Sequence, residues 1–267
     1  MLQQLHLPSF KAIHKGSHGR IAIIGGSEHY TGAPFFSGIS ALHTGADLVS
    51  ILTHPLALLP IKSYSPDLMV SDYNDKEHFV RTIDKSHAIV IGPGLARHPD
   101  TEMILNQIKA HPDIPVVVDA DGLHFYKPGI FKNVILTPNA HEFKQINPNN
   151  LSEQNLAKYL QATILLKGDS DKVITESSIT TIDERSTLRR CGGQGDILTG
   201  ILAVFSAWNP NNLPIAAINA SKLLRRSARL SFEASKGRSQ ITSDIPNFIG
   251  EAFHQLFPND SEYRSKF

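Results

Sequence analysis

A glycine-rich segment that ends in a single carboxylate gives the clearest chemical signal in this sequence. Residues 189–196 read RRCGGQGD, and apolar residues follow at helical spacing from Ile197 onward. A helix that begins here directs its free N–H groups and the positive end of its dipole at one point, which favours an anion such as phosphate. Asp196 could simply stabilise the helix end. Because glycines and arginines surround it, we favour a general base that takes a proton from a hydroxyl attacking a phosphoryl group.

Asn139 and Glu142 form a second candidate pair, three residues apart after a short apolar strand and a proline. One interpretation is structural, with Asn139 as the N-cap of a helix and Glu142 completing a capping box. The other is chemical, because amide and carboxylate oxygens can hold a hydrated Mg²⁺ beside nucleotide phosphates. The sequence leaves both interpretations open.

Charged residues also follow two other predicted strands. Lys167 begins the segment KGDSD, which is either a plain turn or a site where the lysine reaches a phosphate as a point charge. Asp119 and Asp121 could be paired carboxylates for acid–base chemistry, although a helix N-cap accounts for one of them more simply. Cys191 lies beside an arginine at a helix start, but no His/Asn arrangement accompanies it, so we expect a loop or packing residue. The histidines form no zinc motif.

The elements that must position these residues alternate along the chain. Apolar segments without period-two alternation predict strands that are buried on both faces, as in parallel sheets. We expect strands at 20–24, 47–52, 87–91, 115–118, 134–136 and 162–166, and a hairpin at 173–182. We expect helices at 31–44, 100–110, 151–160, 196–208, 213–232 and 244–256. Residues 55–85 receive no assignment. Ligands of such sheets bind at the carboxyl edge of the strands, where every candidate residue follows a strand or begins a helix.

Composition limits the class of protein. The chain has 267 residues, of which 41% are hydrophobic and 19% are charged, as in an ordinary globular protein. A net charge of +1 gives no strong field for nucleic acid or an anionic membrane. One cysteine excludes an internal disulfide, and no apolar run has the length of a membrane span. The N-terminal residues lack the apolar core of a secretory signal. We therefore expect a cytoplasmic protein with a single domain over residues 1–267, in which residues 1–18 form a leader.

The first strand and the helix after it exclude one common nucleotide-binding motif. Residues 25–33 read GGSEHYTGA, which does not match the G-x-G-x-x-G fingerprint of dinucleotide-binding dehydrogenases. In order along the chain, however, the motifs match a different family: GGS with YTGAP, ADLV, IGPGL, VDADGL, LTPN through Glu142, KG and CGGQGD. On these segments, the chain resembles the ATP-dependent NAD(P)H-hydrate dehydratases of the ribokinase-like superfamily, and the resemblance spans roughly residues 15 to 255.

This resemblance implies a three-layer α/β/α sandwich with a central, mostly parallel sheet. It also implies ATP-dependent dehydration of the S epimer of hydrated NADH or NADPH, through phosphorylation of the ring hydroxyl and loss of phosphate. The implied co-substrate is ATP, with Mg²⁺. A separate epimerase is implied as a functional partner, because no epimerase domain is fused to the chain. A homo-oligomer is also expected.

The resemblance assigns roles to individual residues. Asp196 is the catalytic base. The implied ATP-binding residues are Lys167, Gly168, Asp169, Ser170, Asp171, Ser186, Thr187, Leu188, Arg189, Arg190, Cys191, Gly192, Gly193, Gln194 and Gly195. The implied substrate-binding residues are Gly94, Asn139, Ala140, His141, Glu142, Phe143, Lys144, Gln145 and Asp196. Asn139 and Glu142 are also the implied ligands of Mg²⁺, through water.

Two rival functions share the same residues. A small-molecule kinase of the superfamily, for example one acting on a vitamin precursor, would use the same anion site and base. A non-catalytic nucleotide-binding protein would tolerate loss of Asp196 or of the glycine loop, and both are intact here. One position departs from the dehydratase pattern, because Ala96 stands where the family usually has glycine after GPGL, and it crowds a loop near the substrate.

Overall fold

The strands form one sheet of nine in the order β3-β2-β1-β4-β5-β6-β7-β8-β9. The computed structural model describes residues 5–9, 14–97 and 101–258. The strands are β1 (Arg20–Ile24), β2 (Leu48–Thr53), β3 (Met69–Asp72), β4 (Ala88–Ile91), β5 (Val116–Val118), β6 (Val134–Leu136), β7 (Thr163–Leu166), β8 (Lys172–Ile174) and β9 (Ile179–Thr181). The strands from β3 to β7 pair in parallel, and β8 and β9 add antiparallel pairs at one edge.

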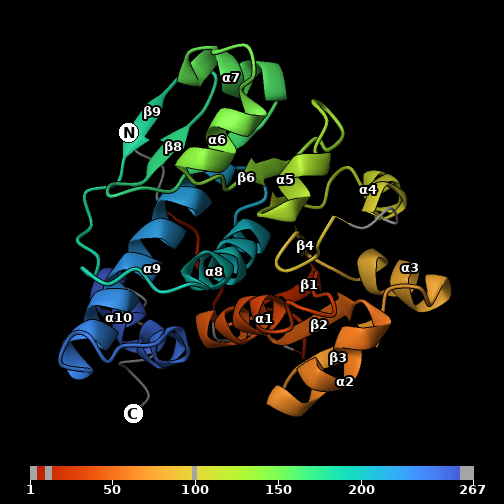
Figure 1. Ribbon diagram of the computed structural model, residues 1–267, viewed down its shortest axis with the longest axis horizontal. Helices are drawn as coiled ribbons and strands as arrows, with labels where there is room; N and C mark the ends of the chain where they lie inside the picture. The colour runs from red at the N-terminus through yellow and green to blue at the C-terminus, as the bar shows by residue number, and fades with distance from the viewer. Residues whose placement is uncertain (1–4, 10–13, 98–100, 259–267) are drawn as a thin grey trace.

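Helices cover both faces of this sheet (Figure 1). They are α1 (Gly32–Thr44), α2 (Pro55–Tyr64), α3 (Lys76–Asp84), α4 (Thr101–Lys109), α5 (Asp121–Phe125), α6 (Ala140–Ile146), α7 (Glu153–Leu160), α8 (Gln194–Trp208), α9 (Leu213–Ala234) and α10 (Ile249–Leu256), with a 3-10 helix η1 (Thr242–Phe248). One core joins the sheet to α1, α2, α8, α9 and α10, and the other joins it to α3, α4, α5 and α7. The predicted three-layer α/β/α sandwich is confirmed.

The two cores explain why the strands lack period-two alternation. Along β1, Ile21 and Ile23 pack into one core while Ala22 and Ile24 pack into the other, and all four are buried. Successive side chains of a strand point to opposite faces, so a strand between two layers of helices must be apolar at every position. The continuous apolar segments in the sequence therefore predicted a sheet covered on both faces.

Residues 55–85, which the sequence left unassigned, form α2, β3 and α3. The start of α2 has a weak sequence signal, because the His54 side chain accepts the capping hydrogen bond and Pro60 lies inside the helix. Leu56 and Leu59 are exposed, at 60% and 74%, so the helix lacks a clean apolar stripe. The strand β3 is short and lies at the edge of the sheet, where burial imposes less of a pattern.

The other predicted elements are present with shifts of one or a few residues at their ends. The predicted helix 244–256 is divided, since its first part is the 3-10 helix η1 and only Ile249–Leu256 is α-helical. Asp100, the predicted start of one helix, lies outside the described residues. In the described part of the leader, the amide of His6 donates to Asn209 Oδ1 at 2.8 Å, which ties residues 5–9 to the turn after α8.

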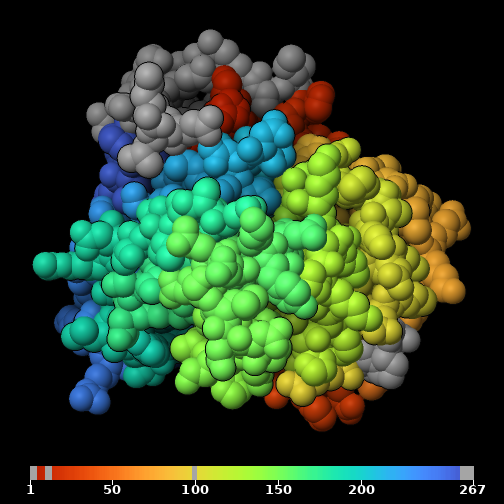
Figure 2. All heavy atoms as spheres, turned by 90° about the horizontal axis from the view of Figure 1, so that it is seen from above, coloured from red at the N-terminus to blue at the C-terminus, as the bar shows by residue number. Residues whose placement is uncertain are grey.

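The segment of α6 and α7 lies in the centre of the face seen from above, between the segments of α5 and of the β8–β9 hairpin (Figure 2). The loops after β4 to β7 come together at the carboxyl edge of the sheet and place the candidate residues there. No helix in the described part of the chain is long and apolar enough to cross a membrane.

Candidate active site

A buried ion pair connects two adjacent strand ends. Lys167, which follows β7, donates from Nζ to Asp119 Oδ1 at 2.7 Å, and Thr137 Oγ1 donates to the same oxygen at 2.6 Å. Asp119 follows β5 and is only 2% exposed. A buried carboxylate is stable only when a cation and hydrogen bonds compensate its desolvation, and here both do. The pair therefore fixes the lysine ammonium at the carboxyl edge of the sheet.

Asp196 shares this cluster. Burial and, to a smaller extent, repulsion from the Asp119 carboxylate raise the pKa of Asp196 to about 7, while attraction to Lys167 acts in the opposite direction. Burial alone would lower the pKa of Lys167, but Asp119, Glu142 and Asp196 together hold it above its ordinary value. A carboxylate that titrates near neutral pH suits a general base better than an ordinary aspartate, which would be a weak base. The environment thus prepares Asp196 for proton transfer.

The start of α8 brings backbone amides to the same place. Gly193 is the N-cap of α8 and has a φ of +99°, a left-handed conformation that favours glycine. Gly195 approaches the ion pair so closely that a Cβ there would lie 3.3 Å from Lys167 Nζ and 3.8 Å from Asp119 Oδ2. The glycines therefore let the first turn of α8, with its unpaired N–H groups, lie directly against the lysine.

Asn139 and Glu142 form the capping box that the sequence offered as one alternative. Asn139 Oδ1 accepts from the amides of His141 and Glu142 at 2.9 and 3.0 Å, and Glu142 Oε2 accepts from the amide of Asn139 at 2.7 Å. Glu142 Oε2 also lies 4.0 Å from Lys167 Nζ. The described residues contain no cluster of three or more acidic, histidine or cysteine side chains that could enclose a metal. The pair fits a Mg²⁺ that keeps its waters and is held mainly by phosphates.

A first cavity, which we call the arginine cavity, lies on the α8 side of this capping box. It has a volume of about 480 Å³. Every residue implied as ATP-binding lines it except Ser170, Leu188, Gly192 and Gly193. Asn139, Leu198, Leu224 and Arg225 complete its wall. Its cations are Lys167, Arg189, Arg190 and Arg225. A cavity with several cations beside a helix N-terminus is suited to a polyphosphate.

Arg225 was missed by the sequence analysis, because it lies inside α9 without any motif. It is 8% exposed, donates from Nε to the Glu184 carbonyl at 2.7 Å, and pairs through NH1 with Asp171 Oδ1 at 3.2 Å. Asp171 also accepts from the Gly168 amide at 2.9 Å and from Ser221 Oγ at 2.7 Å. These contacts fix the loop after β7, so Asp171 serves the cavity by holding its wall.

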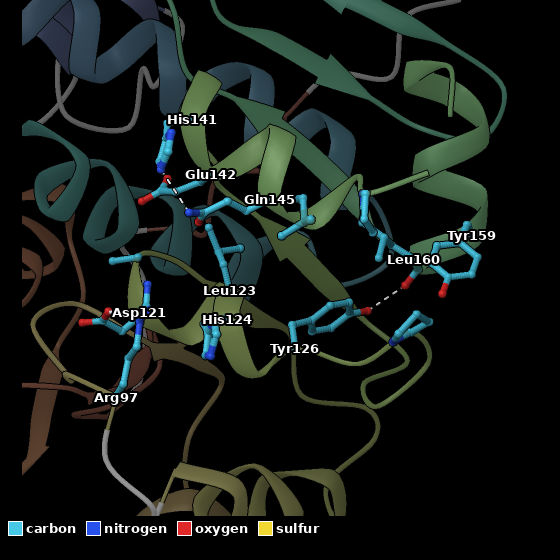
Figure 3. A pocket seen from close by; sticks show the side chains of 14 residues that line it. Arg97, Asp121, Leu123, His124, Tyr126, His141, Glu142, Gln145, Tyr159 and Leu160 are labelled. Atoms are coloured by element: carbon cyan, nitrogen blue, oxygen red, sulfur yellow. Dashed lines mark hydrogen bonds and ion pairs between the residues drawn. The ribbon is translucent and has the colours of Figure 1, made fainter. Parts of the chain in front are cut away.

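A second cavity, which we call the tyrosine cavity, lies on the other side of the same capping box. It has a volume of about 710 Å³ and is lined from α5, α6, α7 and the loop after β4. Figure 3 shows Glu142 and Asp121 toward one end and Tyr126, Leu160 and Tyr159 toward the other. Glu142 belongs to the wall of this cavity and also faces Lys167 of the arginine cavity. The two cavities therefore adjoin where Glu142 faces Lys167, and we call Lys167, Asp119, Glu142 and Asp196 the catalytic cluster.

The residues implied as substrate-binding are distributed around this junction. His141, Glu142 and Gln145 line the tyrosine cavity, and Asn139 lines the arginine cavity. Gly94 lies beside the segment after β1, since a Cβ there would come within 2.6 Å of the Tyr30 carbonyl. Ala140, Phe143 and Lys144 line neither cavity, and Phe143 packs against the core under α6.

The expectation that Asp119 or Asp121 caps a helix is wrong. The N-cap of α5 is Ala120, whose side chain cannot cap, with a φ of +47°. Asp119 points instead to Lys167, and Asp121 Oδ2 accepts from the Ala96 amide at 3.0 Å. The physical reason is that the charge of the buried Lys167 ammonium must be paired with a carboxylate. Asp119 provides that carboxylate and therefore does not cap α5.

One smaller prediction is confirmed, and the structure adds a finding at a second position. Cys191 behaves as a loop residue, since its Sγ accepts from Arg189 Nε at 3.3 Å and lies 3.5 Å from the Gln240 carbonyl. Ala96 has a φ of +59°, a left-handed conformation that glycine adopts without strain. Ala96, which replaces the usual glycine of the family, thus lies at a position where a residue with a Cβ adopts an unfavourable backbone conformation.

The fold has known counterparts. A ribokinase-like superfamily protein from Enterococcus faecalis superimposes with a TM-score of 0.82 at 21% identity, covering 94% of this chain and 92% of that chain. An ADP/ATP-dependent NAD(P)H-hydrate dehydratase from Bacillus subtilis, co-crystallised with ATP/Mg²⁺, superimposes with a TM-score of 0.78 at 21% identity, covering 94% of each chain. The class that the architecture defines is therefore the ribokinase-like α/β fold.

Sequence comparison narrows this class. A sequence model described as NAD(P)H-hydrate dehydratase matches residues 21–248. An ATP-dependent (S)-NAD(P)H-hydrate dehydratase of Ixodes scapularis is 38% identical over 92% of this chain and 91% of its own length. That of Entamoeba histolytica is 40% identical over 91% of this chain and 89% of its own length. The chain belongs to the NAD(P)H-hydrate dehydratase family.

Proposed function

We propose that this protein uses ATP to dehydrate the S epimer of hydrated NADH or NADPH and so restores the reduced dinucleotide. The family and the names of its relatives support the substrate and the phosphoryl donor. The single observation that carries the chemistry is Asp196, a carboxylate with a pKa of about 7 in the first turn of α8, where it interacts with Lys167 and Asp119.

In the first step, Asp196 takes the proton of the ring hydroxyl, and the hydroxyl oxygen attacks the γ-phosphorus of ATP. The bond from that phosphorus to the bridging oxygen breaks, and ADP leaves with the electron pair. Negative charge spreads over the transferred group. The amides of residues 192–195 lie at the helix N-terminus, where donors that are already in place stabilise such charge without rearrangement.

In the second step, the phosphorylated oxygen leaves as inorganic phosphate. The ring nitrogen donates its lone pair to the carbon that carries the oxygen, and the neighbouring carbon then loses a proton to restore the ring double bond. Phosphorylation is needed because hydroxide is a poor leaving group, whereas phosphate is a good one. The sum is one ATP consumed, and one ADP, one phosphate and one reduced dinucleotide formed.

The surrounding residues have supporting roles in this proposal. The arginine cavity holds ATP, with Arg189 and Arg190 exposed at its mouth and Lys167 at its inner end. Asn139 and Glu142 would hold Mg²⁺ through water, and the ion when bound neutralises phosphate charge. Gly94 and residues 139–145 hold the hydrated nicotinamide end of the substrate. Asp119 keeps Lys167 in place and keeps the pKa of Asp196 high.

The proposal extends to the setting of the reaction. We expect a hydro-lyase in which residues 1–267 act as a single domain in the cytoplasm. Because the enzyme acts on one epimer, a separate epimerase that interconverts the two would complete the repair of hydrated dinucleotides. We also expect a homo-oligomer.

Product analysis tests this function against the rival kinase. The purified protein is incubated with hydrated NADH, ATP and Mg²⁺, and the products are separated by chromatography and followed by phosphorus NMR. The proposal predicts NADH, ADP and free phosphate in equal amounts. Accumulation of a stable phosphorylated compound would identify a kinase and contradict the dehydratase.

A further inference from the structure

The tyrosine cavity is larger than the proposed chemistry at Asp196 requires. The nicotinamide end of the substrate must reach the junction of the two cavities, and ATP occupies the arginine cavity. A volume of about 710 Å³ remains on the far side of Glu142, within the usual range for a cavity that encloses a ligand. Its more distant lining residues have no role in the transfer or elimination steps.

The lining groups of this cavity change in type along its length. Glu142, Asp121 and Arg97 lie toward one end, His124 lies toward the middle, and Tyr159 lies at the other end (Figure 3). The side chain of Arg97 is 61% exposed and lies 4.0 Å from Asp121 Oδ1, so its guanidinium remains accessible from the cavity. The carboxylates and Arg97 thus share one end of the cavity, His124 follows, and an aromatic ring lies at the other end.

The far end of the cavity is held rigid. The Tyr126 hydroxyl donates to the Leu160 carbonyl at 2.7 Å and thereby joins the end of α5 to the end of α7. Tyr159 precedes that carbonyl on α7 and is 53% exposed. An exposed ring on a fixed helix end is available for stacking, and every nucleobase has a face on which an aromatic ring can stack.

We propose that the tyrosine cavity binds the adenosine phosphate half of the hydrated dinucleotide, with Tyr159 stacked on the adenine and Arg97 and His124 beside the diphosphate. The order of groups in the cavity matches the order of groups in the substrate. His124 lies between Glu142 and the aromatic ring, and Arg97 lies beside Asp121, so both nitrogen donors precede the ring along a dinucleotide that extends from Glu142 toward Tyr159. This inference rests on the proposed function, since it places the second half of the same substrate.

The test compares the full substrate with a truncated one. Hydrated NADH and hydrated reduced nicotinamide mononucleotide share the reacting ring, but only the first carries the adenosine phosphate. For Tyr159→Ala, we expect KM for hydrated NADH to rise about five- to twenty-fold with little change in kcat, as loss of one stacking contact implies. We expect kcat/KM for the mononucleotide to stay unchanged. Tyr159→Phe keeps the ring and should behave as the wild type.

A direct binding measurement accompanies the kinetics. NADH, the reaction product, is fluorescent, and its affinity can be titrated in the absence of turnover. Tyr159→Ala should weaken NADH binding by a similar factor and leave binding of reduced nicotinamide mononucleotide unchanged. Equal losses for both ligands, or no loss for either, would overturn the inference while leaving the dehydratase activity intact. A wild-type protein that turns over neither substrate would overturn the proposed function itself, and with it the inference.

Discussion

The two cavities beside the α6 capping box differ in what they offer a ligand. The arginine cavity has four cations and a helix N-terminus, whereas the tyrosine cavity has one arginine, two histidines, two carboxylates and two tyrosines. Both proposed ligands are nucleotides. The difference in lining residues therefore reflects which part of its nucleotide each cavity binds. In our proposals, the arginine cavity holds ATP by its phosphates, whose charge changes in the reaction. The tyrosine cavity holds the adenosine phosphate half of the hydrated dinucleotide, so that the reacting ring is placed against Asp196.

We propose that the reaction takes place at the boundary between the two cavities. Lys167 lies within hydrogen-bonding distance of Asp119 and ion-pairing distance of Glu142 there, and Asp196 interacts with Lys167 and Asp119. The capping box starts α6 and lies between the two cavities, so in our proposals it also separates the two ligands. The following changes should act on one side of this boundary or on the boundary itself.

The largest effect is expected for Asp196→Asn, which removes the base at the boundary. Loss of a general base costs about a hundred- to ten-thousand-fold in kcat. ATP affinity should stay within about threefold of wild type, because an uncharged side chain next to the phosphates removes no attraction. Formation of NADH and calorimetric titration with ATP measure the two quantities. Near-normal turnover in the variant would refute the assigned role.

Asp119→Asn should have the next largest effect and a distinctive pH signature. For wild type, kcat/KM should rise with pH as Asp196 loses its proton, with a midpoint of about 7. The Asp119 charge raises the pKa of Asp196, so removing it lowers that pKa, and the unpaired Lys167 then lowers it further. The rising limb of the kcat/KM–pH profile should therefore lie at lower pH in Asp119→Asn than in the wild type. We expect the plateau to fall about ten- to hundred-fold because Lys167 loses its fixed position.

A pH–rate profile of Asp119→Asn beside the wild type measures both features. Thr137→Val is a matched control, since it removes a neutral donor from the same carboxylate and should shift the profile little. A rising limb at unchanged pH in Asp119→Asn, at any level of activity, would show that Asp119 does not control the protonation of Asp196.

Arg190→Gln should affect only the arginine cavity. Arg190 pairs with Asp169 and is 78% exposed, so its contact with phosphate is screened by solvent. We expect KM for ATP to rise about three- to tenfold, with KM for the hydrated dinucleotide unchanged. Steady-state kinetics with each substrate varied in turn measures the two KM values separately. A rise in both KM values would show that the two cavities are not independent.

Ala96→Gly should produce the smallest change, on the side of the tyrosine cavity. The left-handed backbone at Ala96 costs about 1 kcal/mol for a residue with a Cβ, although glycine also gains freedom when unfolded, which reduces the benefit. A gain of about 0.5 kcal/mol corresponds to a rise of one or two degrees in Tm. Differential scanning calorimetry measures it, and a lower Tm would show that the loop carries no strain at Ala96.

The sequence predicted most of the sheet because its strands are buried on both faces. Ile21 to Ile24 form a continuous apolar run for that reason, and the order of polar segments after such runs located the carboxyl edge. The region of α2 and β3 could not be predicted in the same way, because an exposed helix and an edge strand leave a weak apolar pattern. Local pattern is strong where burial is complete and weak at the edge of the molecule.

The site was predicted in part for a similar reason. The glycines before Asp196 are required locally by the first turn of α8, so their spacing is visible in the sequence. Asp119 and Arg225 act through partners 48 and 54 residues away, Lys167 and Asp171, and no local pattern records such contacts. The roles of both residues follow only from the fold, which brings separate strand ends and α9 together.

The most direct test of the central claim is the near-ultraviolet absorbance of NADH after the protein is added to hydrated NADH and Mg²⁺. Parallel reactions contain ATP, ADP or no nucleotide. The account predicts a rise in absorbance with ATP alone, matched by release of one phosphate per NADH formed. No rise with either nucleotide, in a protein that binds ATP, would contradict it.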